Sequence, residues 1–235
     1  MSNRSSLILG ISLAVAMALA AAILSQGIQK FKLLDRTVVV KGLAEQEVAA
    51  NIAIWPVKFS AADNDLSEVY DALERQAEQV RAFLLLQGFS DGEITLSTPS
   101  VTDKLAQSYG PESSPLRYSG SMTLTIYTDK VDLVLGGRQQ LFTLAKQGVN
   151  LSSEDYNART EFMFTGLNDL KPAMIEQATR NAREVAQRFA EDSQSKLGKI
   201  RRAQQGIFSI RDRDSTTPHR KKVRVVSTVE YYLVD

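Results

Sequence analysis

The stretch FMFTGLNDLKPAMIEQATRNAREVAQRFAEDSQSKLGKIRRAQQGIFSI, residues 162–210, indicates most clearly how this chain folds. Apolar residues recur in its middle at three- and four-residue intervals, the spacing of one helix face. We therefore expect a long helix from about Asp169 to Lys196, closed by Gly198, with Pro172 tolerated only within its first turn. The expected buried stripe is Ile175, Ala178, Ala182, Val185 and Phe189, flanked by Ala186 and Ala190.

Strand patterns surround this helix. We expect a strand over 149–164 before it, and a closing pair of strands over 199–210 and 221–233 after it. The closing pair is joined by the polar loop RDRDSTTPH, residues 211–219. The helix thus lies between strands on both sides, which favours a mixed fold rather than a helical bundle.

The first half of the chain shows the same order of elements. TVVVKG (37–42) and then Glu45–Ser60 are strand-like, and Pro56 indicates an edge position or a bulge because it cannot donate to a strand ladder. Asp65-Leu-Ser-Glu68 resembles a capping box that opens a helix. Its expected buried stripe is Leu66, Val69, Leu73, Ala77, Val80 and Leu84, and its expected C-cap is Gly88.

Two strands and a further helix follow. Glu93–Leu105 and Tyr118–Thr128 are strand candidates, the second with Met122, Leu124 and Ile126 on one face. Asp129 is a candidate N-cap for the helix, which we expect to close near Gly148. The pair Gly136-Gly137 weakens the prediction that this helix is continuous.

These patterns predict an α+β fold in which duplicated strand–helix–strand–strand units form antiparallel sheet packed against helices, preceded by one N-terminal transmembrane helix. The expected organisation has an N-terminal signal-anchor or transmembrane segment at 1–28, a stalk at 29–35 and one folded domain at 36–235. Within that domain we expect two pseudo-repeats at about 36–129 and 149–235, with a linking helix at 130–147.

The segment from Leu7 to Leu24 is apolar and uncharged. As a helix it would be about 27 Å long, close to the thickness of a hydrocarbon core. We expect a retained inner-membrane anchor through residues 7–24. Cleavage at Ala18-Leu19-Ala20, which would leave a soluble periplasmic protein, stays open as the alternative. Lys30, Lys32 and Arg36 follow the segment and, taken alone, place the domain in the cytoplasm.

Composition excludes most catalytic constellations. The chain has no cysteine and one histidine, His219, so neither a histidine-based triad nor a multi-histidine metal site can be built from one copy. We expect His219 to be a solvated loop residue, with a pH-sensitive contact as the alternative. Nucleotide-binding motifs are lacking, and a net charge of +1 gives no reason to expect nucleic acid. We assign no catalytic, cofactor-binding or metal-ligating residue.

Two groups of residues are candidates for binding. The aromatic residues are Trp55, Phe59, Tyr231 and Tyr232, for which core packing is the main interpretation and a ligand or partner surface the alternative. The basic residues are Arg201, Arg202, Arg220, Lys221 and Lys222, interpreted as edge protection or as contacts to lipid headgroups or a partner.

Four acidic residues occur in pairs. Asp63 and Asp65 precede the first helix, where capping and turn formation explain them. Asp212 and Asp214 alternate with Arg211 and Arg213, which indicates local charge pairing on an exposed hairpin.

Four stretches resemble the SIMPL-domain family of bacterial envelope proteins. They are residues 162–210, quoted above, RTVVVKGLAEQEVAANIAIW (36–55), VRAFLLLQGFSDGEIT (80–95) and KVRVVSTVEYYLVD (222–235). The most specific feature is the A-x-x-x-A-R step from Ala178 to Arg183, followed by L-G-K-I. One departure is Trp55-Pro56-Val57, where many relatives carry a Pro-Asp pair earlier in the strand, and this is typical of the subgroup with an N-terminal span.

The resemblance implies a periplasmic domain, exported or anchored, in a family with loose links to stress tolerance and some homo-oligomers. It offers no catalytic residues to carry over, and it favours a domain outside the cytoplasm, against the local charge count. We expect a non-enzymatic, membrane-anchored periplasmic module of the cell envelope that self-associates as a homo-oligomer. The alternatives are a binding module for an apolar or aromatic ligand or an envelope protein, and an enzyme that uses carboxylates and arginines alone.

Overall fold

The computed structural model describes residues 36–106, 115–152 and 159–234, together with residues 13, 14, 16, 17, 20 and 21. The predicted span and stalk therefore lie almost wholly outside the described residues. Among the residues that are described, no helix is long and apolar enough to cross a bilayer. The chain divides into two compact units: unit 1 has its described residues within Met1–Gln46, Leu170–Ser209 and Val223–Asp235, and unit 2 within Glu47–Asp169 and Ile210–Lys222.

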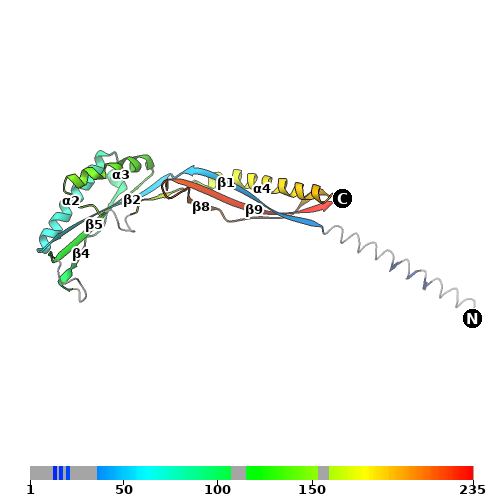
Figure 1. The fold of residues 1–235 in the computed structure, drawn as a ribbon, viewed down its shortest axis with the longest axis horizontal. Coiled ribbons are helices and arrows are strands. Elements are labelled where there is room, and N and C mark those ends of the chain that lie inside the picture. Colours follow the sequence, from blue (N-terminus) through cyan, green and yellow to red (C-terminus); the bar gives the residue numbers. More distant parts are fainter. Residues whose placement is uncertain are drawn as a thin grey trace, which may run out of the picture. The chain divides into compact units, whose positions relative to one another are not determined.

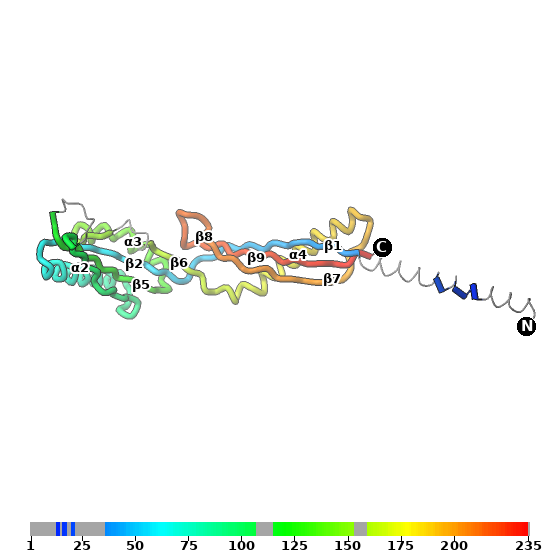
Figure 2. Tube along the Cα trace, turned by 90° about the horizontal axis from the view of Figure 1, so that it is seen from below, coloured from blue at the N-terminus to red at the C-terminus, as the bar shows by residue number. Residues whose placement is uncertain are grey.

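The sheet of unit 1 consists of long strands covered by one helix. In the described residues its order is β1 (Thr37–Ala49), β9 (Arg220–Val234) and β7 (Lys196–Gln205), and β8 (Ser209–Asp212) also pairs with β9. The helix α4 (Leu167–Asp192) runs alongside β1 and β9 (Figures 1 and 2). Its core cluster is Val40, Ala182, Ala186, Val229 and Tyr231.

The buried stripe of α4 differs from the one expected. Its buried residues are Met174, Ala178, Ala182, Ala186 and Ala190, whereas Val185 and Phe189 are exposed. The buried residues recur every four positions, and all but Met174 are alanines. Their small side chains allow the helix to approach β1 so closely that a Cβ atom at Gly42 would have no room. The expected assignment of Val185 and Phe189 to the core is therefore wrong.

Both ends of α4 also differ from the expected ends. The helix begins at Leu167, so Pro172 lies inside it, beyond the first turn in which we expected it. It ends at Asp192, and the residue with positive φ after it is Gln194, at 56°. Gly198 instead belongs to β7, where it lies against the backbone of Tyr232.

The sheet of unit 2 consists mainly of two long paired strands, β2 (Ile52–Asp63) and β5 (Tyr118–Thr128). Among the described residues its order is β3 (Ile94–Leu96), β5, β2 and β6 (Glu161–Met163), and β4 (Ser100–Asp103) also pairs with β5. β2 pairs antiparallel with β5 and β6, and β5 pairs antiparallel with β3 and β4. Two short 3₁₀ helices, η1 (Asp91–Glu93) and η2 (Lys104–Ala106), flank the edge strands.

The helix α2 (Leu66–Leu86) of unit 2 confirms Asp65 as its N-cap, but the N–H of Asp65 donates to the Asp63 carboxylate at 3.0 Å and not to Glu68, so the predicted capping box is only half formed. The Asp65 carboxylate accepts a hydrogen bond from the backbone N–H of Ser67, and Gly88 follows the helix end with φ of 96°. Leu66 is exposed, but the rest of the predicted stripe is buried: Val69, Leu73, Ala77, Val80 and Leu84.

The second helix of this unit, α3 (Val131–Lys146), is continuous through the glycine pair. A Cβ atom at Gly137 would lie 3.0 Å from the ring of Trp55, so this glycine makes room for the buried indole. The N-cap residue is Lys130 and not Asp129, which corrects that prediction. The N–H of Lys130 instead donates to the Thr128 hydroxyl at 3.0 Å.

The strand expected over 149–164 is not continuous among the described residues, and positions 153–158 of that range lie outside them. Of the described residues in this range, Glu161–Met163 form β6, and Leu151 makes one isolated bridge to Phe59. Pro56 lies in β2 between these two contacts and pairs with Thr125 of β5 on the other side. β2 lies between β5 and β6, and its register with β5 runs regularly through Pro56, so among the described residues Pro56 is neither in an edge strand nor at a bulge in this pairing.

The described residues confirm an α+β fold, with three helices packed on two antiparallel sheets. Each sheet contains the same order of strands. In unit 1 the first strand β1 neighbours the later strand β9, and β9 neighbours β7, which precedes it along the chain. In unit 2, β2, β5 and β3 stand in the same relation, and in both units a long helix follows the first of these strands in the unit's chain order.

Candidate functional site

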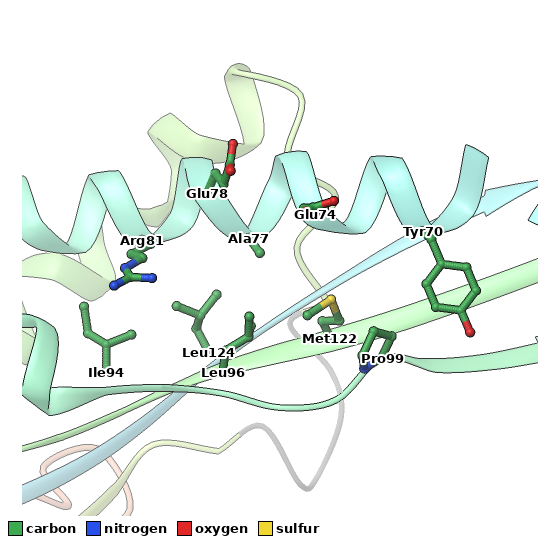
Figure 3. A pocket seen from close by; sticks show the side chains of 10 residues that line it. All are labelled: Tyr70, Glu74, Ala77, Glu78, Arg81, Ile94, Leu96, Pro99, Met122 and Leu124. Carbon is green, nitrogen blue, oxygen red and sulfur yellow. The ribbon is translucent and has the colours of Figure 1, made fainter. Parts of the chain in front are cut away.

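A groove of about 580 Å³ lies in unit 2 between α2 and the strands β3 and β5 (Figure 3). This volume is in the range of small-molecule sites in proteins. The groove exists because α2 packs mainly on β2 and β5 and leaves the edge strands less covered. Its position is therefore a consequence of how the helix lies on the sheet.

One wall of the groove is a flank of α2. Tyr70, Glu74, Ala77, Glu78 and Arg81 line it, spaced so that they recur along one side of the helix. In Figure 3, Tyr70, Ala77 and Arg81 turn toward the sheet, whereas Glu78 stands on the outward side of the helix. The carboxylates are thus at the mouth of the groove rather than on its floor.

The floor and opposite wall are apolar. Met122 and Leu124 come from the buried face of β5, and Ile94, Leu96 and Pro99 come from the edge. Leu96 is 50% exposed although its side chain faces the groove. An apolar ligand would therefore remove hydrophobic surface from water on binding, which is favourable.

The side chains around the groove carry a net negative charge. Arg81 is engaged by Asp91, to which its Nε and Nη2 atoms donate at 2.9 and 2.5 Å. Glu74 and Glu78 form no ion pair with any residue in the described part of the chain. With Asp91 included, three carboxylates stand against one guanidinium, which leaves two net negative charges.

A second polar cluster fixes the end of the edge strand next to the groove. Glu93 accepts hydrogen bonds from the N–H and hydroxyl of Ser90, the hydroxyl of Thr128 and the ammonium of Lys130, at 2.6 to 2.9 Å. Burial raises the pKa of Glu93, but these hydrogen bonds outweigh it and lower the pKa to about 2. This carboxylate is saturated with donors, so we assign it a structural role.

Trp55 and Phe59, two of the aromatic candidates, lie in the core of unit 2. They are 2% and 0% exposed, and Trp55 makes an edge-on contact with Phe89 at 6.1 Å between ring centroids. Core packing accounts for both side chains as they stand. Neither lines the groove.

Tyr231 and Tyr232, the other two aromatic candidates, belong to unit 1. Tyr231 is buried in its core cluster, where burial raises the pKa of its phenol and the hydroxyl has no hydrogen-bond partner among the described residues. Tyr232 is half-buried, with the Arg201 guanidinium 5.9 Å from its ring centroid. The structure therefore does not gather the four aromatic residues into one core, and their role as a ligand surface stays a prediction.

The basic candidates lie in different environments. Arg201 pairs with Glu230 at 2.9 Å, and Arg202 and Lys222 are exposed. Lys221 is buried and paired with Asp212, and the Nε atom of Arg220 is buried without a hydrogen-bond partner among the described residues. Lys221 is thus poorly placed for a lipid headgroup, whereas Arg202 and Lys222 are accessible.

The loop acids and the histidine have local partners. Asp214 accepts hydrogen bonds from the backbone and hydroxyl groups of Thr216 and Thr217 and from Arg213, and these hold the pKa of its carboxyl well below the usual range. His219 makes an edge-on contact with Phe162 at 6.0 Å. In the described residues, no group of three or more His, Cys, Asp or Glu side chains is placed to hold a metal ion.

Sequence reasoning did not find the groove. Its members are ordinary helix and strand residues, and which flank of α2 overhangs the edge strands depends on helix placement. One signal was present: Tyr70, Glu74, Glu78 and Arg81 recur at three- and four-residue intervals beside the predicted buried stripe, to which the fifth lining residue, Ala77, belongs. That spacing shows a shared face but not that the face borders a cavity.

Comparison with known protein families gives one match. The family described as SIMPL, protein of unknown function (DUF541), matches residues 38–231. The match includes both units and the whole groove. A comparison with curated proteins finds no match.

Proposed function

The chain belongs to the SIMPL family, whose function is unknown, and from that membership we propose that it is a non-enzymatic, membrane-anchored protein of the periplasmic envelope that self-associates. One observation carries the proposal of self-association. Of the two end strands of the unit 1 sheet, β1 exposes Val39 and Leu43 on either side of Lys41, while β7 carries four basic residues.

The edge strand β7 carries features that oppose pairing with another chain. Lys196, Lys199, Arg201 and Arg202 fall within its ten residues. Charged side chains on an edge strand, lysine above all, are a known device against unwanted association. A second copy of the chain would bring the same positive charges, so a β7–β7 contact is disfavoured.

The other edge strand, β1, is less protected. Val39 and Leu43 are exposed on its open face. The Leu43 carbonyl accepts a hydrogen bond from Asn181 of α4 at 2.7 Å, so this helix flank overhangs the edge of β1. Val185 and Phe189 follow Asn181 at four-residue steps and are 40% and 56% exposed. Because Asn181 occupies the Leu43 carbonyl, the backbone groups that would meet a second copy are those of β1 before Leu43, next to the apolar helix flank.

The anchor and the compartment form part of the same proposal. The apolar, uncharged segment 7–24 supports a single-pass inner-membrane anchor with the domain in the periplasm, and cleavage to a soluble periplasmic protein is the alternative. Membrane fractionation followed by the mass of the mature N-terminus distinguishes the two. A mass that begins at Met1 or Ser2 supports the anchor, and one that begins after residue 20 overturns it.

The proposal of a non-enzymatic role rests on the sequence. A cysteine nucleophile, a histidine base and a zinc site of cysteine and histidine ligands all need residue types of which the chain has none and one. The one carboxylate cluster with a pKa of about 2 is saturated with hydrogen bonds from Ser90, Thr128 and Lys130. A carboxylate held ionised in this way is a poor proton donor near neutral pH.

We attribute the common plan of the two units to a duplicated strand–helix–strand–strand element. The shared strand order, β1-β9-β7 and β2-β5-β3, supports this. Along the chain, the strands β2 to β6 and the helices α2 and α3 of unit 2 lie between β1 and α4 of unit 1. A duplication would accordingly be nested rather than in tandem.

The absence of cysteine makes self-association directly testable by disulfide cross-linking. Single cysteines at Thr37, Val39 or Lys41 in the full chain, oxidised in membranes, are expected to give a covalent dimer at one of these positions. Antiparallel pairing of two β1 strands brings equivalent Cβ atoms to about 5 Å at the two-fold axis, near the separation that a disulfide needs.

The matched control is Gln204→Cys on β7, which is also exposed on an edge strand. Dimer from β1 and not from β7 supports the proposal. Equal yields from both strands, or no dimer from any β1 position, contradict it.

A second candidate function is ligand binding in the groove under α2. The apolar floor from β5 and the exposed Leu96 favour it, since a ligand there would bury hydrophobic surface. This function is compatible with self-association through β1, because β1 does not line the groove.

A further inference from the structure

We propose that the groove between α2 and the edge strands takes an elongated organic amine, with the apolar body in the groove and the cationic nitrogen at its mouth beside Glu74 and Glu78. This inference rests on the second candidate function, ligand binding in the groove. It adds the charge and shape of the ligand, which the lining residues determine as follows.

The shape of the groove sets the size of the apolar body. Tyr70 and Arg81 lie at opposite ends of the lining flank of α2 (Figure 3) and are eleven residues apart, about 16 Å along a helix. Pro99 lies near the Tyr70 end and Ile94 near the Arg81 end. An extended chain or a single aromatic ring with a short alkyl arm fits a volume of about 580 Å³.

The floor of the groove selects against a polar body. Met122, Leu124 and Leu96 offer no hydrogen-bond partner from their side chains, so a sugar or a free amino acid would lose hydration there without compensation. An alkyl or aromatic body pays no such cost and gains from burial.

The charges at the mouth select the cation. Glu74 and Glu78 are one helical turn apart, and like charges at this spacing repel and destabilise a helix slightly. Neither forms an ion pair with a described residue, so a bound ammonium group would relieve their repulsion. The third carboxylate, Asp91, is already neutralised by Arg81.

The same charges disfavour an anion. Arg81 is the cation of the lining, and its Nε and Nη2 atoms are occupied by Asp91 at 2.9 and 2.5 Å. A carboxylate ligand would have to displace Asp91 while approaching Glu74 and Glu78. A fatty acid is therefore the wrong ligand for this groove, although its tail would fit the floor.

Three probes of equal shape test the inference: 4-phenylbutylamine, 4-phenylbutan-1-ol and 4-phenylbutyrate. The full chain is held in nanodiscs of zwitterionic lipid, and binding is measured by calorimetry at pH 7 with empty nanodiscs subtracted. We expect the amine to bind at least tenfold more tightly than the alcohol, and the alcohol more tightly than the carboxylate.

Two pairs of substitutions assign the effect to the groove. Glu74→Gln with Glu78→Gln removes both mouth charges and is expected to lower amine affinity to that of the alcohol, with alcohol affinity unchanged. Glu68→Gln with Asp71→Asn removes two charges from the same helix outside the lining and is expected to keep the tenfold preference. Leu96→Gln is expected to weaken amine and alcohol alike.

Each other result overturns the inference in a recognisable way. Equal affinity for amine and alcohol that is sensitive to Leu96→Gln leaves groove binding in place but refutes the charge selection. Equal loss of amine affinity in both double variants shows a general effect of helix charge. No binding of any probe refutes both the inference and the groove function on which it rests.

Discussion

A Cβ atom at Gly42 would lie 1.8 Å from the carbonyl oxygen of Ala178 and 2.5 Å from the amide nitrogen of Ala182. Both are backbone atoms of α4, so no side-chain rotation can relieve the clash. β1 and α4 of unit 1 can therefore approach each other this closely only because residue 42 has no side chain. The alanine stripe of the helix is the other half of the same contact.

We predict that Gly42→Ala destabilises unit 1 by about 3 kcal/mol, because α4 must move away from the sheet and lose packing. Hydrogen exchange in α4 and β1 and urea unfolding followed by circular dichroism measure this. Gly136→Ala is the control, because a Cβ atom at this position meets nothing within 4 Å. Alanine favours an exposed helix over glycine, so we expect this substitution to raise the free energy of unfolding by about 0.5 to 1 kcal/mol. Similar effects from the two substitutions would refute the packing argument.

At the scale of elements, Glu93 joins three segments of unit 2. Its carboxylate receives hydrogen bonds from the start of η1, the end of β5 and the residue that caps α3. The Lys130 ammonium also donates to the Gly88 carbonyl at 3.1 Å, which adds the end of α2 to the cluster. One side chain thereby ties together the termini of the elements that carry the groove.

The pKa of Glu93 predicts the acid sensitivity of unit 2. Because the folded-state pKa, about 2, lies below the ordinary value of 4.5, the carboxylate stabilises the fold fully above pH 4.5 and loses that contribution as the pH falls toward 2. We expect Glu93→Gln to cost roughly 2 to 3 kcal/mol at pH 7 and under about 1 kcal/mol near pH 2. Urea unfolding followed by Trp55 fluorescence measures both values. A cost that does not change with pH would contradict the prediction.

At the scale of the whole molecule, each unit has its own core. Trp55, the only tryptophan in the chain, is buried in the cluster of unit 2, whereas Tyr231 and the α4 alanines belong to that of unit 1. The fluorescence of Trp55 therefore reports on one unit, and circular dichroism reports on both.

We predict that in Gly42→Ala part of the circular dichroism signal is lost at a lower urea concentration than in the wild type. The midpoint of the unfolding transition followed by Trp55 fluorescence should stay within error of the wild-type value. Two units with separate cores need not unfold in one cooperative step. Glu93→Gln should produce the converse, a shift of the Trp55 midpoint with little change in hydrogen exchange of α4. Equal shifts of both signals in either variant would show one cooperative unit instead.

Local patterns in the sequence predicted most of the elements. Alternation gave β5 its exact bounds, Asp65 marked the start of α2, and the heptad-like spacing of α2 predicted five of its buried residues. These features depend on contacts between near neighbours along the chain. The predictions failed where a distant segment decides the outcome. Val185 and Phe189 have the spacing of core residues. The buried face of α4 is instead lined by alanines, because β1 approaches the helix too closely at Gly42 for larger side chains.

The sequence by itself determined the α+β class, the start of α2, the family and the poverty of catalytic side chains, since these follow from composition and short-range order. Only the tertiary structure decided that β1 pairs with β9 near the other end of the chain, that alanines and not Val185 or Phe189 face the sheet, and that α2 leaves a groove lined by Glu74 and Leu96. Side-chain periodicity determines which face of an element is apolar. It does not determine which distant element covers that face, because that choice depends on the packing of the whole unit.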